Sequence, residues 1–292
     1  MRFILCQPAI QRFKWELEVC LSNLKGKGID DIVLLFSRHD DSIPAFFKEK
    51  YKAEVHVYED LRESGEYIPS LKPYLWWCYL SENPQAKNDT YFYMDSDIIF
   101  REIPDFSQTP ANEEHWYGSD CGGYLNYDYI KQCKNGEEII KEMSDIVGVS
   151  MNRIKNINEN SIGAQYVISQ PTADYWQKVY EDSNKLWQYF KTLDTTLQIW
   201  TAEMWSTLWN MLYFGIYPRA SEELEFCWAT DDMHRWYETK IMHNAGVCDD
   251  MERLFFKGKY TEESPFNDDL SFVDKNKVSK KYVEAIESVA HD

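Results

Sequence analysis

The sequence predicts an α/β fold in which a mostly parallel central sheet is flanked by helices. Short apolar runs alternate with helix-like segments over residues 1–100, which is typical of βαβ units. The 292 residues are 44% hydrophobic and 27% charged, the composition of a globular protein with a substantial core. Nowhere do 18 apolar residues run together, so neither a membrane span nor a membrane partner is expected.

Each βα unit is predicted from its own local pattern. Buried strands are expected where apolar residues run together, at 3–6, 32–36, 55–58 and 91–94. Helices are expected where apolar residues recur at helical spacing, at 11–24, at 43–51 and from Ser70 to the Asn83-Pro84 pair. Because a helix follows each of the first three strands, these strands are expected to pair in parallel.

The remainder is expected to complete one domain of residues 1–260. Its predicted elements are a strand over 115–126 that ends in Gly122-Gly123, a helical insertion over about 127–160, and helices over 172–190 and 197–214. Residues 261–276 show no periodicity, so the 261–292 region is expected to be a loose linker followed by a C-terminal helix at 279–290.

Charge and cysteine content restrict the partners. Lys and Arg number 31 against 49 Asp and Glu, so the formal charge of −18 will not draw the chain onto nucleic acid, although a local basic groove stays open. Aromatic residues make up 16% of the chain, and such side chains stack on sugars and nucleobases as well as filling cores. The seven cysteines are odd in number without a CxxC pair, which argues against a disulfide framework.

Two acids stand at the end of the fourth predicted strand, in the segment YMDSDII at 93–99. In an open α/β sheet the ligand crevice lies off the carboxyl ends of the strands. Alternate strand residues face one side, so Asp95 and Asp97 can aim at one point, where unpaired carboxylates would repel each other. Oxygen ligands of this kind suit Mg²⁺ or Mn²⁺ with a diphosphate as partner. The alternative is a pair of surface or helix-capping acids.

This segment resembles a known family. YFYMDSDIIF, preceded by three βα units, is similar to the DxD strand of nucleotide-sugar glycosyltransferases with the GT-A fold, a Rossmann-like sheet flanked by helices. The resemblance extends from Arg2 to about Lys259. It implies that the motif holds a metal that binds the donor diphosphate, with Asp97 as a direct ligand and Asp95 reaching both the metal and the nucleotide ribose.

Two later segments match the same family. IMHNAG at 241–246 resembles the place of a third metal ligand, which implies that His243 binds the metal; an imidazole is a good donor for Mn²⁺. Without the resemblance, a buried structural histidine is the alternative. FFKGK at 255–259 resembles the basic stretch that contacts donor phosphates, with Lys257 as the first candidate and Lys259 as the second. The alternative is a solvated lysine pair.

Further donor contacts are expected from loops that share the crevice with Asp95. The candidates are Gln7 and Pro8 after the first strand, Asp60 after the third, Lys72 in a Lys-Pro segment, Ser96 between the two acids, and Gln165 in a small-residue turn that resembles the sugar side of the family site. Lys72 is equally compatible with a solvated residue beside Pro73 at the start of a helix.

A catalytic base is sought among the remaining acids. Glu203, Thr207 and Asn210 form a polar stripe on the helix predicted at 197–214, which could present Glu203 to the acceptor or simply face solvent. Asp120 is the second candidate for the base, and Asp231-Asp232 are rivals.

The predicted function is sugar transfer from a nucleoside-diphosphate sugar, with a UDP-sugar as the expected donor class, to a hydroxyl, with Mn²⁺ or Mg²⁺ as cofactor. A resemblance to small viral or microbial transferases, distantly like hydroxyproline sugar transferases, implies an acceptor on a protein or glycan, or a hydroxymethylated pyrimidine in DNA, as in bacteriophage DNA modification. Cationic groups for DNA could come from Lys131, Lys134, Lys141, Arg153 and Lys155.

Two other classes remain as alternatives. One is a non-catalytic module that binds a sugar or nucleotide, and the other is a metal-dependent nucleotidyltransferase, although no Gly-rich triphosphate loop is present. The cysteine usage and the lack of a signal-peptide pattern predict a cytoplasmic location, in the host cytoplasm if the chain is viral. The sequence predicts neither the oligomeric state nor retention or inversion at the sugar.

Overall fold

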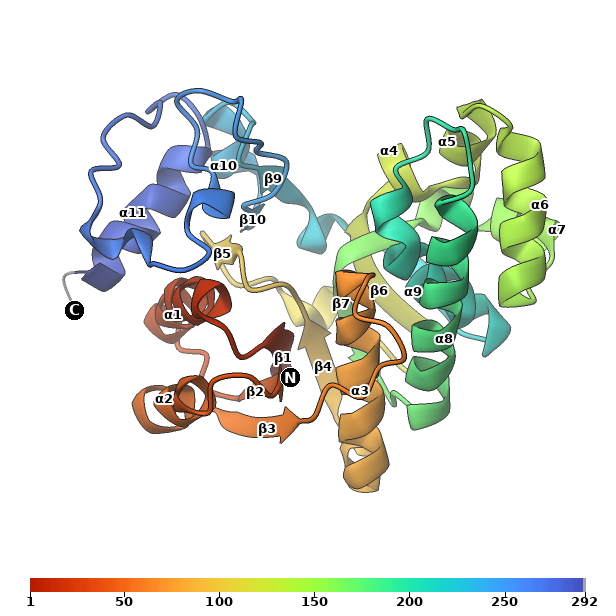
Figure 1. Ribbon diagram of the computed structural model, residues 1–292, viewed down its shortest axis with the longest axis horizontal. Helices are drawn as coiled ribbons and strands as arrows, with labels where there is room; N and C mark the ends of the chain where they lie inside the picture. The colour runs from red at the N-terminus through yellow and green to blue at the C-terminus, as the bar shows by residue number, and fades with distance from the viewer. Residues whose placement is uncertain (291–292) are drawn as a thin grey trace.

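The computed structural model describes residues 1–290, which form two sheets and the helices that cover them (Figure 1). The larger sheet has seven strands in the order β3-β2-β1-β4-β7-β6-β8, and a smaller sheet has the order β5-β10-β9. The strands of the larger sheet are β1 (Arg2–Pro8), β2 (Ile32–Ser37), β3 (Glu54–Tyr58), β4 (Thr90–Tyr93), β6 (His115–Asp120), β7 (Ile162–Ser169) and β8 (Tyr217–Ala220). Those of the smaller sheet are β5 (Ile98–Phe100), β9 (Phe226–Trp228) and β10 (Ile241–His243).

The helices alternate with the strands in the first half of the chain and cluster in the second. They are α1 (Gln11–Gly26), α2 (Ser42–Lys50), α3 (Leu71–Glu82), α4 (Gly122–Leu125), α5 (Tyr127–Gln132), α6 (Gly136–Val147), α7 (Met151–Asn156), α8 (Ala173–Phe190), α9 (Ala202–Tyr213), α10 (His234–Glu238) and α11 (Ser279–Ala290). The predicted mixed α/β architecture is confirmed, with helices on both faces of a mostly parallel sheet.

The order of the first four strands determines where a ligand can bind. Strands β3, β2, β1 and β4 run parallel to their neighbours. Helices α1 and α2 lie on one side of this part of the sheet and α3 on the other (Figure 1). Strands β2 and β3 are therefore added on one side of β1, and β4 on its other side. Such a reversal of the strand order, a topological switch point, leaves a crevice at the carboxyl ends of β1 and β4.

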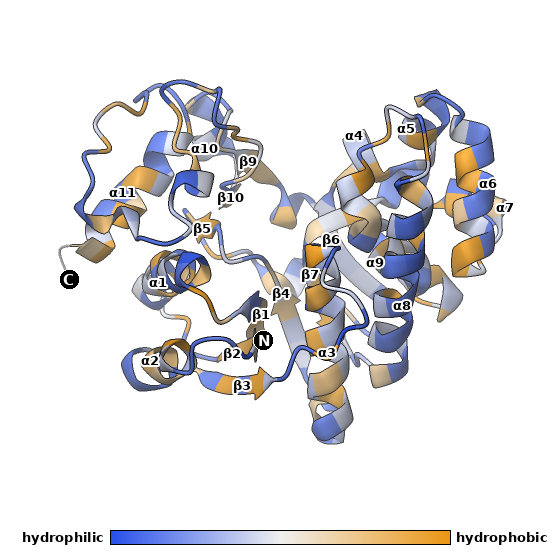
Figure 2. Ribbon diagram, in the orientation of Figure 1, coloured by the Kyte–Doolittle hydropathy of each residue, from blue (hydrophilic) through white to orange (hydrophobic). Residues whose placement is uncertain are grey.

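The second half of the chain packs helices against the continuation of the sheet. Strand β7 pairs antiparallel with both β4 and β6. Helix α8 packs between α3 and α9, with the buried rings of Trp76 and Trp176 stacked at 4.9 Å. In Figure 2, α6 and α8 carry hydrophobic and hydrophilic residues on different sides, as expected of helices with one buried face.

Three predicted boundaries differ from the structure. Strand β6 ends at Asp120, and the Gly122-Gly123 pair begins helix α4 instead of closing a strand. The helix predicted from residue 197 begins at Ala202, after a short 3₁₀ turn at Ile199–Thr201. The apolar residues after the DSD segment form β5 in the smaller sheet, so the two acids lie in a turn between two sheets and not within one core strand.

The C-terminal region is packed against the body of the fold. Helix α11 lies beside α1 (Figure 1), and its Tyr282, Val283 and Ile286 are buried in a cluster with Trp15 of α1. The preceding segment is largely hydrophilic in Figure 2, yet it buries side chains in the same cluster, including those of Leu270 and Val273. Residues 261–276 are therefore held in place by apolar contacts, and not loose as their lack of periodicity suggested.

Among the helices of residues 1–290, none combines the length and the apolarity needed to cross a bilayer.

A glycine in β7 makes a close contact that a larger residue would disturb. A Cβ atom on Gly163 would lie 2.6 Å from Met204 Cε and 2.9 Å from both Cys121 Sγ and Leu125 Cδ1. We expect Gly163→Ala to lower the free energy of unfolding by about 1–3 kcal/mol, because overpacking forces neighbours off their preferred rotamers. Urea denaturation measures this loss, and shortening Met204 in the same chain should recover part of it. An unchanged midpoint in the single variant would contradict the expectation.

Candidate metal and donor site

A cavity of about 580 Å³ opens at the switch point between β1 and β4. Its walls include Gln7 and Pro8 at the end of β1, the DSD turn, Ala164 and Tyr166 of β7, Glu203 and Met204 of α9, and His243 of β10. Residues far apart in the sequence therefore meet at the edge of the sheet where the parallel strands β1 and β4 end.

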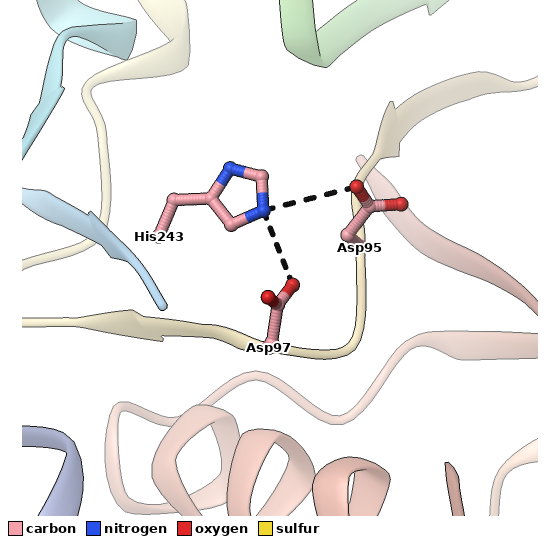
Figure 3. A group of neighbouring side chains, drawn as sticks. All are labelled: Asp95, Asp97 and His243. Atoms are coloured by element: carbon pink, nitrogen blue, oxygen red, sulfur yellow. Dashed lines mark ion pairs between the residues drawn. The ribbon is translucent and has the colours of Figure 1, made fainter. Parts of the chain in front are cut away.

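The two acids and the histidine form one cluster in this cavity. His243 Nε2 lies 3.2 Å from Asp97 Oδ1 and 3.8 Å from Asp95 Oδ2 (Figure 3). One ligand atom from each of the three residues lies within 4.8 Å of the others. Asp97 and His243 are buried, and Asp95 is partly exposed. This cluster of Asp95, Asp97 and His243, called the metal cluster below, can hold a divalent metal ion.

The pairing of the smaller sheet brings His243 to the acids. Strand β10 pairs antiparallel with β5, with His243 opposite Ile98, the residue that follows Asp97. The backbone N–H of Asn244 donates to the carbonyl of Asp97 at 2.9 Å, which fixes the turn against β10. The two carboxylates thus converge through a turn, whereas the sequence suggested the alternation of a single strand.

Two lysines lie against these carboxylates. Lys72 Nζ donates to Asp95 Oδ1 at 3.1 Å, and Lys257 Nζ forms an ion pair with Asp97. Burial alone would raise the pKa of Asp97, but Lys257 and His243 hold that pKa well below its ordinary value. Asp97 therefore stays ionised in the folded chain.

Glu203 shares the same charge network from the opposite wall. Its carboxylate lies 3.6 Å from Lys72 Nζ and accepts a 3.0 Å hydrogen bond from Thr207 Oγ1. Burial raises the pKa of Glu203, and Asp95 adds to this effect while Lys72 opposes it. The polar stripe is buried, since Glu203 is 3% exposed and Thr207 and Asn210 are fully covered. The structure thus rules out the solvent-facing interpretation of this stripe.

Glu16 of α1 also belongs to the site, although it was not predicted from the sequence. It is 1% exposed, accepts hydrogen bonds from Ser96 Oγ at 2.9 Å and Arg12 Nε at 3.0 Å, and lines the cavity. Burial raises the pKa of this carboxyl group. The signal was present in the helical pattern, because residue 16 lies among Phe13, Cys20 and Leu24 on the apolar stripe. An acid on such a stripe indicates a buried role.

The chemistry of the cluster fits a divalent cation. Two carboxylates and one imidazole form a donor set that Mn²⁺ and Mg²⁺ accept, with open positions left for oxygen atoms of a ligand. His243 Nδ1 is buried without a hydrogen-bond partner among the described residues, while Nε2 points at both acids. The ring stacks on Trp228 at 5.9 Å and 11°, which holds it in the plane that directs Nε2 to the cluster.

Most predicted donor contacts lie in the cavity, but two do not. Gln7, Pro8, Lys72, Ser96 and Lys257 all line it. Gln165 does not, because its side chain is fully buried and its amide donates to the carbonyl of Leu224 at 3.2 Å. Its neighbour Ala164 lines the cavity instead, with a φ of 60° at an irregular point in the β6–β7 pairing. The predicted segment is therefore at the cavity, whereas the predicted side chain faces away.

Asp60 lies outside the cavity and holds a loop. Both carboxylate oxygens accept hydrogen bonds from Arg62 at 2.9 Å, and Arg62 in turn donates to Ser70 Oγ at 3.0 Å, next to α3. The structure thus gives Asp60 a partner other than the donor, because the short Asp-x-Arg spacing closes a local ion pair.

This ion pair predicts a pH-dependent contribution to stability. The Arg62 hydrogen bonds lower the pKa of Asp60, so the contribution is present above the ordinary Asp pKa of about 4 and is lost as the pH falls through the lower folded value. We expect Asp60→Asn to reduce the free energy of unfolding by about 1 kcal/mol at pH 7, with the difference from wild type shrinking below about pH 4. Urea titrations at both pH values test this, with the exposed Asp249→Asn as control. A pH-independent difference would contradict it.

The remaining candidate acids and Lys259 lie away from the cluster. Asp120 is exposed at the end of β6, where it accepts from the Gly122 N–H at 2.8 Å and lines a second cavity. Asp231 accepts from the Trp228 N–H at 2.9 Å, and Asp232 pairs with Lys277 at 2.7 Å. None of these side chains lines the cavity that holds the metal cluster.

Comparisons with known proteins identify the fold. No protein-family model matches the sequence, and no curated protein matches it. The bifunctional glycosyltransferase WbbM, in its apo structure, superposes with a TM-score of 0.53 at 8% identity over 98% of this chain. This chain spans 49% of the WbbM chain, about half its length.

A second solved structure is similar over nearly its whole length. The galactosyltransferase LgtC, in complex with donor and acceptor sugar analogues, superposes with a TM-score of 0.52 at 11% identity, covering 99% of this chain and 96% of LgtC. An active-site mutant of LgtC gives a TM-score of 0.50 at 10% identity. At such identities a likeness shows the fold. The chain has the GT-A fold of these glycosyltransferases, with an Asp-x-Asp cluster that can hold a metal ion at its sheet edge.

Proposed function

We propose that this chain is a metal-dependent glycosyltransferase that moves a sugar from a nucleoside-diphosphate sugar, of the UDP class, to an acceptor hydroxyl. The observation that carries the proposal is the cluster of Asp95, Asp97 and His243, whose ligand atoms lie within 4.8 Å of one another in a cavity at the switch point of the sheet. The GT-A fold supports the same reaction class.

The residues around the cluster suit the negative charge that develops on the leaving diphosphate in this reaction. The acceptor oxygen forms a bond to the anomeric carbon, whose bond to the phosphate oxygen breaks with its electron pair leaving on the diphosphate. A divalent ion at the cluster would offset the charge of that leaving group. Lys72 and Lys257 bring positive charge to the same cavity and are placed to contact phosphate oxygens.

The acceptor proton needs a base. Glu203 lines the cavity and is the first candidate for an inverting reaction, with Asp120 as the second; in a retaining reaction a leaving phosphate oxygen would accept the proton. Gln7, Pro8 and Ser96 would bind the donor near its nucleotide, since they line the cavity that holds the cluster.

Release of a nucleoside diphosphate from a panel of nucleotide sugars tests the proposal. We expect release with at least one UDP-sugar in the presence of Mn²⁺ or Mg²⁺, and loss of release on adding a chelator. Binding of a nucleotide sugar without turnover would instead indicate a binding module, and release of inorganic diphosphate from a nucleoside triphosphate would indicate a nucleotidyltransferase. Either result would contradict the proposal.

The cytoplasm is the proposed location, because all seven cysteines are free and five of them are buried.

The proposed acceptor is a hydroxyl on a protein or glycan. The alternative, a hydroxymethylated pyrimidine in bacteriophage-type DNA, would require cations near the site. The basic residues of the insertion do not provide them: Lys131 pairs with Glu137, Lys134 with Asp194, and Arg153 donates to the carbonyl of Leu212. Neither these residues nor Lys141 and Lys155 line either cavity.

A further inference from the structure

A second cavity, of about 610 Å³, adjoins the cavity that holds the metal cluster. Tyr124 and Trp228 line both cavities, and their ring centroids lie 6.3 Å apart. The outer walls come from the end of β6 and from the segments around β9, including Asp120, Glu222, Glu225, Phe226 and Asp231. These residues play no part in the metal cluster.

The second cavity carries negative charge. Asp120, Glu222, Glu225 and Asp231 line it, and Arg235 is the one basic residue among its lining. The two terminal guanidinium nitrogens of Arg235 are already engaged, with Glu225 and Glu238, each at 2.7 Å. Glu222 is exposed and forms no hydrogen bond or ion pair through its side chain within residues 1–290. A phosphate backbone entering this cavity would meet carboxylates, not the cations that bind it.

Aromatic rings and carboxylates together suit a sugar. Phe226 and Trp228 pack at 4.9 Å and 61°, and the negative face of an aromatic ring attracts the electropositive hydrogens on sugar carbons. Carboxylates accept charge-assisted hydrogen bonds from hydroxyl groups, and Glu222 has that capacity free. An uncharged, hydroxyl-rich molecule can use both kinds of group without electrostatic repulsion.

The shared wall would place such a molecule next to the cluster of Asp95, Asp97 and His243. Trp228 stacks on His243 at 5.9 Å and 11°, so the wall of the second cavity is in direct contact with a residue of the metal cluster. We propose that the second cavity is the acceptor site and that it selects an uncharged carbohydrate over a nucleic acid. This inference rests on the proposed glycosyltransferase function, because only a transfer reaction requires a second substrate next to the donor.

Binding measurements on the full chain test the assignment. The probes are an array of neutral oligosaccharides and a DNA duplex containing hydroxymethylcytosine, each with UDP and Mn²⁺ present. We expect binding to at least one neutral glycan and none to the duplex at physiological salt. Glu222→Lys removes an exposed hydrogen-bond acceptor, and we expect it to weaken glycan binding about tenfold.

A matched control separates this effect from a general charge effect. Glu142→Lys makes the same change at an exposed position of α6 outside both cavities, and should leave glycan binding unchanged. Duplex binding by the wild type, equal weakening by both variants, or UDP binding without any bound glycan would each overturn the acceptor assignment. Binding of UDP is measured separately: its failure while a glycan still binds would refute the proposed function and leave the carbohydrate site standing.

Discussion

Asp97→Ala is expected to lower the rate of nucleoside diphosphate release by about 10³-fold. Asp97 provides one ligand atom 3.2 Å from His243 Nε2 and pairs through its other oxygen with Lys257. Its loss would remove a proposed metal ligand and leave Lys257 without this partner, so two positive charges that would face the leaving diphosphate are misplaced together. Steady-state release from the best UDP-sugar of the panel measures the effect.

Two controls show whether the loss is local. Asp97→Asn keeps the volume and removes the charge, so it should lose nearly as much activity. Because it also takes the ion-pair partner from Lys257, its melting temperature without metal should fall, while a single cooperative transition shows that it still folds. Titration of Mn²⁺ against either variant should show weaker binding. Activity of Asp97→Asn within tenfold of the wild type would remove Asp97 from the metal site.

The metal cluster was predictable because its signal is local. Asp95 and Asp97 are acids among apolar neighbours, and polar side chains at such positions need a partner in the folded chain. His243 follows two apolar residues in the same way. Sequence spacing does not indicate that His243 lies beside Asp95 and Asp97, but the resemblance of residues 241–246 to the third-ligand segment of the family predicted it. The structure confirms that these three residues meet.

Other features of the site depend on how distant strands pair, so the local sequence indicates them less clearly. Gln165 and Ala164 are neighbours, and only the irregular pairing of β6 with β7 determines which one faces the cavity. The second cavity forms between the end of β6 and β9, whose positions are more than a hundred residues apart in the sequence. The placement of Asp120 in that cavity therefore could not be predicted from the residues around it.

The ion pair between the partly exposed Lys72 and the buried Glu203 provides the second large effect, on stability. We expect Lys72→Met to reduce the free energy of unfolding by about 3 kcal/mol in the metal-free chain, because it leaves Asp95 and Glu203 without their shared cation. The side chain of Glu203 is only 4% exposed, so solvent cannot replace the lost partner. Urea denaturation in the presence of a chelator measures the loss.

A double-mutant cycle then assigns part of that loss to Glu203. Glu203→Gln removes the buried charge and keeps the shape, and its amide can still accept from Thr207 Oγ1. If Lys72 stabilises the ionised Glu203, the double variant should be more stable than Lys72→Met alone by about 1 kcal/mol. Strict additivity of the two single changes would mean that Lys72 does not stabilise Glu203 and acts through Asp95 alone.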